Sequence, residues 1–282
     1  MTKDYRIEDL LSLMEKLRDP EFGCSWDRKQ SLRTLTGYTL EEVYEVIDAV
    51  ETGNDAQLQD ELGDLLFQVV FYAQIAKEEG RFEFSEVIGS ITQKLLRRHP
   101  HVFPDASLAS FGNSALALNA EQVAERWELI KNEERAQKAG SENAGAALSV
   151  LDDIPASLPA LDRARKLQKR AASVGFDWPA VRGVIDKVKE ELAELEAELP
   201  QGDQQRIEQE FGDLMFSCVN LARHLQIDPE SSLRGSNRKF EARFRALEGL
   251  ARGGAEALET LDAAQLDGLW NQVKAMENDS VK

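Results

Sequence analysis

Two groups of four carboxylates recur in this chain with the same internal spacing. The first group is Glu42, Glu45, Glu61 and Asp64, and the second is Glu191, Glu194, Glu210 and Asp213. Each member of the first group lies 149 positions before its counterpart, as in the step from 42 to 191. Four converging carboxylates repel one another strongly unless a cation or solvent separates them. All-oxygen ligation favours Mg²⁺ or Mn²⁺ over zinc, so these residues predict two sites for a hard divalent cation.

Each group consists of two pairs that belong on neighbouring helices. Glu42 and Glu45 are three residues apart, as are Glu61 and Asp64, and residues three apart share one face of a helix. The short segment between the pairs predicts an antiparallel helix pair whose acidic faces meet. One such pair alone is more typical of a solvated face in a chain with 51 acids. The repetition of both pairs favours a site.

The apolar frame around the acids is repeated as well. Residues 61–74 (ELGDLLFQVVFYAQ) and 210–223 (EFGDLMFSCVNLAR) are identical at seven of fourteen positions. Such a repeat predicts two copies of one domain. Gly63 and Gly212 stand between the acids, and a glycine inside a helix costs about 1 kcal/mol relative to alanine. We interpret them as points where another helix approaches closely.

The elements that must position these acids are helices. Apolar residues recur at spacings of three and four along most of the chain, and no convincing alternating β-branched run occurs. The pattern predicts an all-α fold with helices at 7–18, 40–50, 58–79, 84–98, 121–138, 158–172, 179–199, 204–225, 229–250 and 263–276. Low complexity at 139–151 predicts a linker, which separates an N-terminal domain (1–138) from a C-terminal domain (152–282).

Composition excludes several classes of function. The formal net charge of −17 argues against binding long nucleic acid, which requires a basic face. The sequence has no apolar run long enough to span a bilayer and no apolar signal core near residue 1. The two cysteines, Cys24 and Cys218, have no metal-binding spacing. These features predict a protein of the reducing cytoplasm with no membrane association.

Basic and aromatic residues also recur after each acidic group. Lys94 and Arg98 match Lys239 and Arg243 at an offset of 145, and Trp127 matches Trp270 at an offset of 143. The basic residues fit either phosphate contacts or a solvated helix end. Trp26, Trp127, Trp178 and Trp270 are each more typical of a core or an interface than of a base-stacking surface.

At E-E-x-x-E followed by E-φ-G-D, where φ is apolar, the chain resembles the MazG nucleotide pyrophosphohydrolases. The resemblance continues through LRDPEFGCSWD, RRHPHVF, LDDIPASLPAL and NRKFEARF, so it covers nearly the whole chain and is specific to the two-domain form. It implies tandem MazG-like helical bundles, a homodimer, and Mg²⁺-dependent hydrolysis of nucleoside triphosphates to monophosphate and pyrophosphate. Apolar helix faces that one small bundle cannot bury also favour a homodimer.

The resemblance also implies roles for individual residues. It makes the second acidic group both catalytic and metal-binding, with the first group as the other metal-binding copy. It implies nucleotide contacts from Lys187, Lys239, Arg243 and Trp270. The 149-residue offset places Tyr38 opposite Lys187, which favours the C-terminal site as the active one. Glu191 is a candidate general base, and a role as metal ligand is equally open.

Two alternatives of different kinds stay open at this stage. One is a non-catalytic helical protein whose acidic faces bind a basic partner. The other is a pyrophosphatase specialised for one modified or deoxy nucleotide. Metal-dependent pyrophosphate release distinguishes an enzyme from the first alternative, and a panel of substrates distinguishes a general enzyme from the second.

Overall fold

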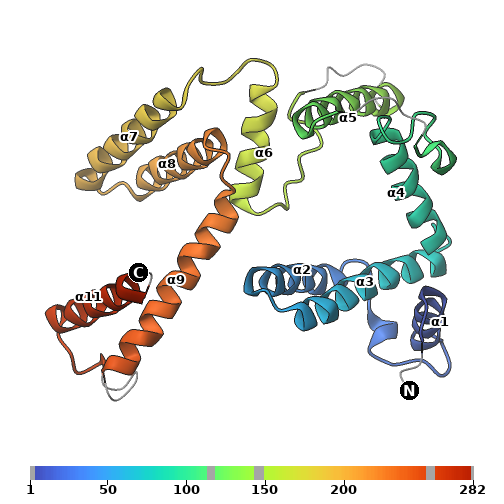
Figure 1. The fold of residues 1–282 in the computed structure, drawn as a ribbon, viewed down its shortest axis with the longest axis horizontal. Coiled ribbons are helices and arrows are strands. Elements are labelled where there is room, and N and C mark those ends of the chain that lie inside the picture. Colours follow the sequence, from blue (N-terminus) through green and yellow to red (C-terminus); the bar gives the residue numbers. More distant parts are fainter. Residues whose placement is uncertain (1–3, 113–117, 143–148, 252–257, 281–282) are drawn as a thin grey trace. The chain divides into compact units, whose positions relative to one another are not determined.

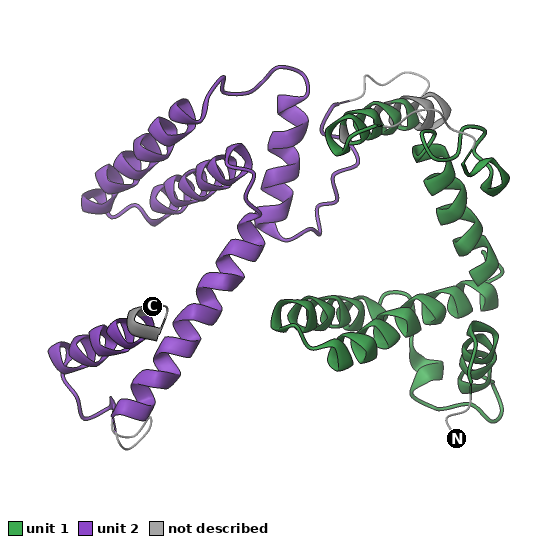
Figure 2. Cartoon of the chain, in the orientation of Figure 1, with its two compact units in different colours: residues 1–142 green, residues 143–282 purple. Residues whose placement is uncertain are grey.

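The computed structural model describes residues 4–112, 118–142, 149–251 and 258–280. The chain divides into two compact units, residues 1–142 and 143–282 (Figure 2), hereafter unit 1 and unit 2. The described residues form helices, turns and loops and no strand, which confirms the all-α prediction. No helix among them has the length and apolar character needed to cross a bilayer.

Unit 1 is built around an antiparallel pair of helices, α2 and α3 (Figure 1). Helices α1 and α4 both contact α3. The elements of unit 1 are α1 (Ile7–Leu17), η1 (Asp27–Lys29), α2 (Leu35–Thr52), α3 (Asp55–Glu78), α4 (Phe84–Arg98), η2 (Leu108–Ser110) and α5 (Ala120–Glu142). Helix α5 thus includes residues 139–142, which the sequence assigns to the linker. Residues 143–148 of that predicted linker lie outside the described residues.

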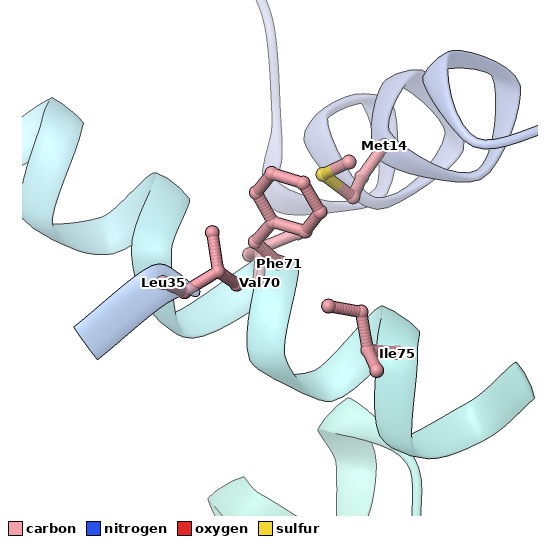
Figure 3. Packing of buried hydrophobic residues seen from close by; sticks show 5 residues of the cluster. All are labelled: Met14, Leu35, Val70, Phe71 and Ile75. Carbon is pink, nitrogen blue, oxygen red and sulfur yellow. The ribbon is translucent and has the colours of Figure 1, made fainter. Parts of the chain in front are cut away.

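The core of unit 1 lies where α1, the start of α2 and the second half of α3 meet (Figure 3). Its side chains are Met14, Leu35, Val70, Phe71 and Ile75, each at most 3% exposed. Burial of large apolar side chains contributes on the order of 1.5–3 kcal/mol each. This core therefore fixes the second half of α3. The first half of α3, which carries Glu61 and Asp64, extends beyond the core.

Unit 2 repeats the central pair as α7 and α8, which lie side by side (Figure 1). Helix α6 contacts α8 and α9, and α11 packs on α9. The elements of unit 2 are α6 (Ala160–Ala172), α7 (Val181–Glu198), η3 (Leu199–Gln201), α8 (Gln204–His224), α9 (Pro229–Leu250) and α11 (Ala263–Ser280). The buried apolar residues among the described part of unit 2 are aliphatic: Val184, Val219, Leu247 and Val273.

The turn within each central pair has the same chemistry in both units. Gly53 (φ 70°) and Gly202 (φ 69°) adopt the left-handed conformation, which glycine reaches without steric cost. The next residue is the N-cap of the second helix: Asn54 accepts a hydrogen bond from the Gln57 amide, and Asp203 plays the same part in unit 2. An N-cap of this kind contributes about 1 kcal/mol. These turns reverse the chain so that the acidic faces meet.

Helix α2 begins five residues earlier than the sequence pattern predicts. The segment 35–39 contains threonine, glycine and tyrosine, which are poor or middling helix formers, so the pattern begins at residue 40. In the structure, Ser31 and Thr34 bond reciprocally, since the Ser31 amide donates to Thr34 Oγ1 (2.9 Å) and the Thr34 amide to Ser31 Oγ (3.3 Å). Buried Leu35 then anchors the first turn.

The interpretation of Gly63 and Gly212 as points of close helix approach is wrong for the described residues. A Cβ added at either glycine would meet no atom within 4 Å outside its own helix and chain neighbours. Apolar side chains near them are also exposed, including Leu62 and Leu66 in unit 1 and Phe211 in unit 2. The two glycines lie on open faces of α3 and α8.

Candidate metal centre

The structure brings three carboxylates together in unit 1. Glu42 and Glu45 extend from α2 and Glu61 from α3, with one oxygen of each within 4.8 Å of the others. Helix α2 supplies its pair at a spacing of three, and the tight turn brings α3 alongside. Side-chain amides line this group, because Gln68 Nε2 donates to Glu42 (3.5 Å) and Gln57 Nε2 donates to Glu61 (3.4 Å).

Unit 2 forms the matching group from Glu191, Glu194 and Glu210, again within 4.8 Å of one another. Glu191 is the most buried member, with 5% of its surface exposed. It forms an ion pair with Lys187, whose Nζ lies 2.7 Å from its carboxylate, and the same ammonium contacts Glu190 at 2.9 Å. The pair compensates the charge of a carboxylate that would otherwise be buried at high cost.

The predicted fourth acid of each group lies outside these three-carboxylate clusters. Asp64 still lies close enough to Glu42 for its charge to raise the pKa of that residue. Asp213 follows Glu210 by three positions on α8 and is exposed. The roles of Asp64 and Asp213 as ligands stay predictions.

Electrostatics differ between the two clusters. Burial raises the pKa of Glu42, and the neighbouring charges of Asp64 and Glu45 raise it further. Burial and the charge of Glu191 likewise raise the pKa of Glu194, whereas Lys187 opposes that rise. Contacts with both of its carboxylate partners raise the pKa of Lys187. Unit 2 therefore carries a compensating cation, whereas the corresponding helix position in unit 1 holds exposed Tyr38.

The donor set of both clusters fits a hard divalent cation. Octahedral Mg²⁺ holds oxygen ligands at about 2.0–2.1 Å, so ligands on opposite sides of it are about 4.2 Å apart. The observed separations of up to 4.8 Å need only a small side-chain adjustment to reach that geometry. Burial raises the pKa values of Glu42 and Glu194, and the charges of neighbouring carboxylates raise both further. A bound cation would relieve that repulsion.

The other predicted nucleotide contacts gather on α9 and α11 of unit 2. Arg243 forms an ion pair with Glu277 (2.8 Å), and its guanidinium lies 5.9 Å from the ring centre of Trp270. Lys239 is near enough to lower the pKa of Glu277, after the larger effect of Arg243 itself. Phe240 packs against Trp270 at 5.5 Å. The structure thus joins three of the four predicted residues, and places Lys187 with the carboxylates.

Unit 1 contains a matching group on α4 and α5. Arg98 pairs with Glu134 (2.6 Å), and Lys131 lies over the ring of Trp127 at 5.7 Å. The sequence analysis misses Glu134 and Glu277, although both could be found from the repeat. The step from 134 to 277 is the same 143 positions that separate Trp127 from Trp270.

Two of the four tryptophans do not occupy the core. Trp26 and Trp178 are 49% and 44% exposed, so they lie outside the core, and an interface position for them stays a prediction. Trp26 contacts Tyr38 edge-on at 5.7 Å. Trp178 instead covers Gly183 at the first turn of α7, where an added Cβ would lie 2.8 Å from its ring. Trp127 and Trp270 are partly buried against their neighbouring helices.

These features define a helical protein with two carboxylate clusters and a basic, aromatic group in each unit. Comparison with known families matches the model of the MazG nucleotide pyrophosphohydrolase domain to residues 30–103 and 182–247. Both acidic groups fall within those segments, as do Lys187, Lys239 and Arg243. The chain belongs to the MazG family.

Curated relatives cover almost the entire chain. It is 50% identical over 276 residues to the nucleoside triphosphate pyrophosphohydrolase of Escherichia coli K12, which covers 97% of this chain and 99% of that protein. It is 44% identical over 268 residues to the nucleoside triphosphate pyrophosphohydrolase/pyrophosphatase MazG of Thermotoga maritima, with 95% of each chain covered. The uncharacterized protein YabN of Bacillus subtilis is 39% identical over 277 residues, which are 98% of this chain and 53% of that protein.

Proposed function

We propose that this protein hydrolyses nucleoside triphosphates to nucleoside monophosphate and pyrophosphate, with Mg²⁺ as its metal and Mn²⁺ as a substitute. The observation that carries the proposal is the cluster of Glu191, Glu194 and Glu210 within 4.8 Å. Its support is the 50% identity to a nucleoside triphosphate pyrophosphohydrolase across nearly the full length of both chains. Housecleaning of the nucleotide pool is the corresponding cellular role.

In this mechanism the carboxylates of unit 2 would hold the metal. When bound, Mg²⁺ would neutralise phosphate oxygens and help to orient a water molecule. Glu191 is buried and fixed by Lys187, which suits a ligand whose position must not vary. Glu194 is exposed, and burial together with the charge of Glu191 raises its pKa, which makes its carboxylate a stronger proton acceptor than an ordinary glutamate. We therefore assign proton transfer to Glu194 and metal ligation to Glu191, with Glu210 and Asp213 as further ligands.

The basic residues of unit 2 would bind the outer phosphates. A cation beside the leaving pyrophosphate stabilises charge that develops as the bond breaks. Lys187, Lys239 and Arg243 supply such charges, and Trp270 offers an aromatic surface for the nucleotide. Unit 1 keeps a carboxylate cluster but has Tyr38 in place of the lysine, so we place the main catalytic site in unit 2.

We further propose a homodimer. Apolar side chains beside the open glycine faces are exposed, among them Leu66 (41%) and Val69 (39%) in unit 1 and Phe211 (55%) in unit 2. A second copy of the chain is the occupant that would cover them. Light scattering at micromolar concentration is expected to give twice the chain mass of 31.6 kDa, and a monomer would contradict this part of the proposal.

A pyrophosphate-release assay tests the activity. The common ribo- and deoxyribonucleoside triphosphates would be supplied separately, with Mg²⁺, with Mn²⁺ and with excess EDTA. We expect pyrophosphate from several nucleotides with either metal and none with EDTA. Release from a single nucleotide would favour a specialised enzyme, and no release from any nucleotide would favour an acidic interaction protein.

Cys24 and Cys218 are free thiols, which supports the cytoplasmic location proposed from the sequence.

A further inference from the structure

A carboxylate holds the same edge of an arginine in both units. In unit 2, Arg243 donates from Nε to Glu277 (2.9 and 3.1 Å) and from Nη2 to the same residue (2.8 Å). In unit 1, Arg98 donates from Nε (3.2 Å) and Nη2 (2.6 Å) to Glu134. The guanidinium group has a second fork, formed by Nη1 and Nη2, which matches a phosphate as well as it matches a carboxylate.

This second fork is available at Arg243. Within the described part of the chain, no other hydrogen bond or ion pair of Arg243 is found besides those to Glu277. Trp270 lies near the guanidinium at 5.9 Å, and Lys239, one helical turn away on α9, lies near the same carboxylate. The carboxylate of Glu277 therefore fixes the guanidinium of Arg243. The Nη1/Nη2 edge of that guanidinium can still donate hydrogen bonds to an anion.

Stability alone does not account for the repetition of this pair. The Glu277 side chain is 42% exposed, and exposed ion pairs contribute at most about 1 kcal/mol. Yet the partners lie on different helices, recur across the repeat and use the same two nitrogens of arginine. In unit 1 a hollow of about 320 Å³, lined in part by Arg97, Arg126 and Glu134, opens beside the pair. In unit 1, Glu134 and Arg97 therefore border accessible space.

We propose that Glu277 is a positioning residue, which holds Arg243 so that the Nη1/Nη2 edge of its guanidinium binds a phosphate of the nucleotide. This inference rests on the proposed function, because it concerns phosphate binding at the same site. Arg243 makes the contact and Glu277 acts only through it. Residues that orient metal ligands change affinity or activity by about 10-fold to 100-fold when they are removed, and we expect an effect at the lower end of that range here.

The two units differ in the number of arginines that bind the glutamate. Glu134 is shared, because Arg97 Nε also donates to it (3.0 Å), whereas Ala242 occupies the position of Arg97 in unit 2. Arg243 therefore engages both oxygens of Glu277 by itself. The exclusive, two-oxygen contact restricts the guanidinium plane more tightly than a shared one, which is the arrangement expected where a phosphate must be held in one orientation.

A double-mutant cycle tests the inference. The full-length variants are Glu277→Gln, Arg243→Ala and the two combined, and the measured quantities are KM and kcat for a hydrolysed triphosphate with Mg²⁺. We expect Glu277→Gln to raise KM about tenfold with a smaller change in kcat, and to add nothing in the Arg243→Ala background. Glu277→Asp, which keeps the charge, should restore part of the affinity.

Controls separate positioning from folding. Arg245 and Glu241 form an exposed ion pair on the same helix, with side chains 74% and 59% exposed, so Glu241→Gln should leave KM unchanged. An unchanged KM in Glu277→Gln would overturn the inference, as would an effect of equal size with and without Arg243. If Glu277→Gln unfolds, Glu277→Asp carries the same cycle.

A binding measurement keeps this inference distinct from the proposed activity. Titration calorimetry with Mg²⁺-pyrophosphate would be run on the same four proteins. If the wild type hydrolyses no triphosphate but binds pyrophosphate with the same dependence on Glu277 through Arg243, the proposed function fails and the positioning role stands. If hydrolysis occurs and binding is the same in all four proteins, the positioning role fails alone.

Discussion

The two units share one framework and differ most at the group that faces the buried glutamate. In unit 2, Lys187 pairs with Glu191 at 2.7 Å. In unit 1, the equivalent Glu42 accepts a hydrogen bond from the neutral amide of Gln68 (3.5 Å) instead of pairing with a lysine, and burial raises its pKa. The same carboxylate spacing therefore produces a cluster with a compensating lysine in unit 2 and a cluster with tyrosine at that helix position in unit 1.

The core shows the opposite asymmetry. Unit 1 buries Met14, Leu35 and Phe71 in one cluster, whereas Phe216 of unit 2, which the repeat aligns with partly buried Phe67, is 44% exposed. The better-packed unit is thus the one that lacks the lysine. Packing and charge compensation are therefore distributed differently between the two units.

The largest expected effect comes from removing one carboxylate in each cluster. Glu194→Gln should lower pyrophosphate release on the order of 100-fold, because it removes a proton acceptor and weakens the metal site. The matched change in unit 1, Glu45→Gln, should lower the rate by less than the roughly 10-fold to 100-fold typical of residues that support a metal site. Steady-state rates of pyrophosphate release with saturating Mg²⁺ compare the two variants. Equal losses, or a greater loss from Glu45→Gln, would reverse the assignment of the two units.

Exchange of the distinguishing residue should have the next largest effect. Lys187→Tyr gives unit 2 the residue of unit 1, and a lost charge-assisted contact is worth about 1.5–3 kcal/mol, so we expect at least a tenfold loss of kcat/KM. Lys187→Arg should keep most of the activity because it keeps the cation. Tyr38→Phe serves as the matched control. A fully active Lys187→Tyr enzyme would remove the reason for preferring unit 2.

The loop before α7 offers a stability test that is specific to unit 2. Arg223, followed by His224 and the Trp178 amide, lowers the pKa of Asp177 to about 2. Because the folded-state pKa is lowered, the ionised carboxylate stabilises the fold above the ordinary value of 3.8, and this stabilisation is lost as the pH falls from 3.8 through about 2.

Asp177→Asn should therefore lower the free energy of unfolding by about 1 kcal/mol at pH 7, after allowance for partial exposure. The difference from wild type should vanish near pH 2. Urea unfolding followed by circular dichroism at several pH values measures it. Asp186→Asn, which alters the exposed pair with Arg182 (3.2 Å), is the control. If the difference in the free energy of unfolding does not depend on pH, Asp177 stabilises the loop through packing or neutral hydrogen bonds and not through its charge.

The smallest expected effect concerns the uncompensated cluster of unit 1. A raised folded-state pKa means that the ionised Glu42 opposes folding above its ordinary value of 4.5, and this cost disappears below that pH. Glu42→Gln should therefore raise metal-free stability at pH 7 by ~0.5 kcal/mol and have no such effect at low pH. In saturating Mg²⁺ the sign should reverse, because a ligand is lost. Thermal melts in EDTA and in Mg²⁺ would show no reversal if unit 1 binds no metal.

The repeat and the helical periodicity predict most of the fold, because amphipathic spacing and turn residues such as Gly53 and Gly202 are local signals. The sequence also identifies three members of each carboxylate cluster, since two helices joined by a tight turn must bring their acidic faces together. It misses the start of α2, where the reciprocal bonds of Ser31 and Thr34 outweigh weak helix propensity.

Long-range partners are harder to predict from residue spacing. Glu277 is one of many acids in a strongly acidic chain. The 143-residue step that it shares with Trp270 could identify it as a repeated residue, but only the packing of α11 on α9 shows that its partner is Arg243. The interpretation of Gly63 and Gly212 failed for a related reason: a glycine shows that a side chain is absent, but its spacing does not show which surface it faces.

Hydrolysis in ¹⁸O-labelled water tests the central claim most directly. The proposed site directs water to the phosphorus that stays with the nucleoside, so pyrophosphate is the leaving group. Mass spectrometry should find the label in the nucleoside monophosphate and none in the pyrophosphate, with both products absent in EDTA and strongly reduced in Glu194→Gln. Label in the pyrophosphate, or release of orthophosphate with a nucleoside diphosphate, would contradict the account.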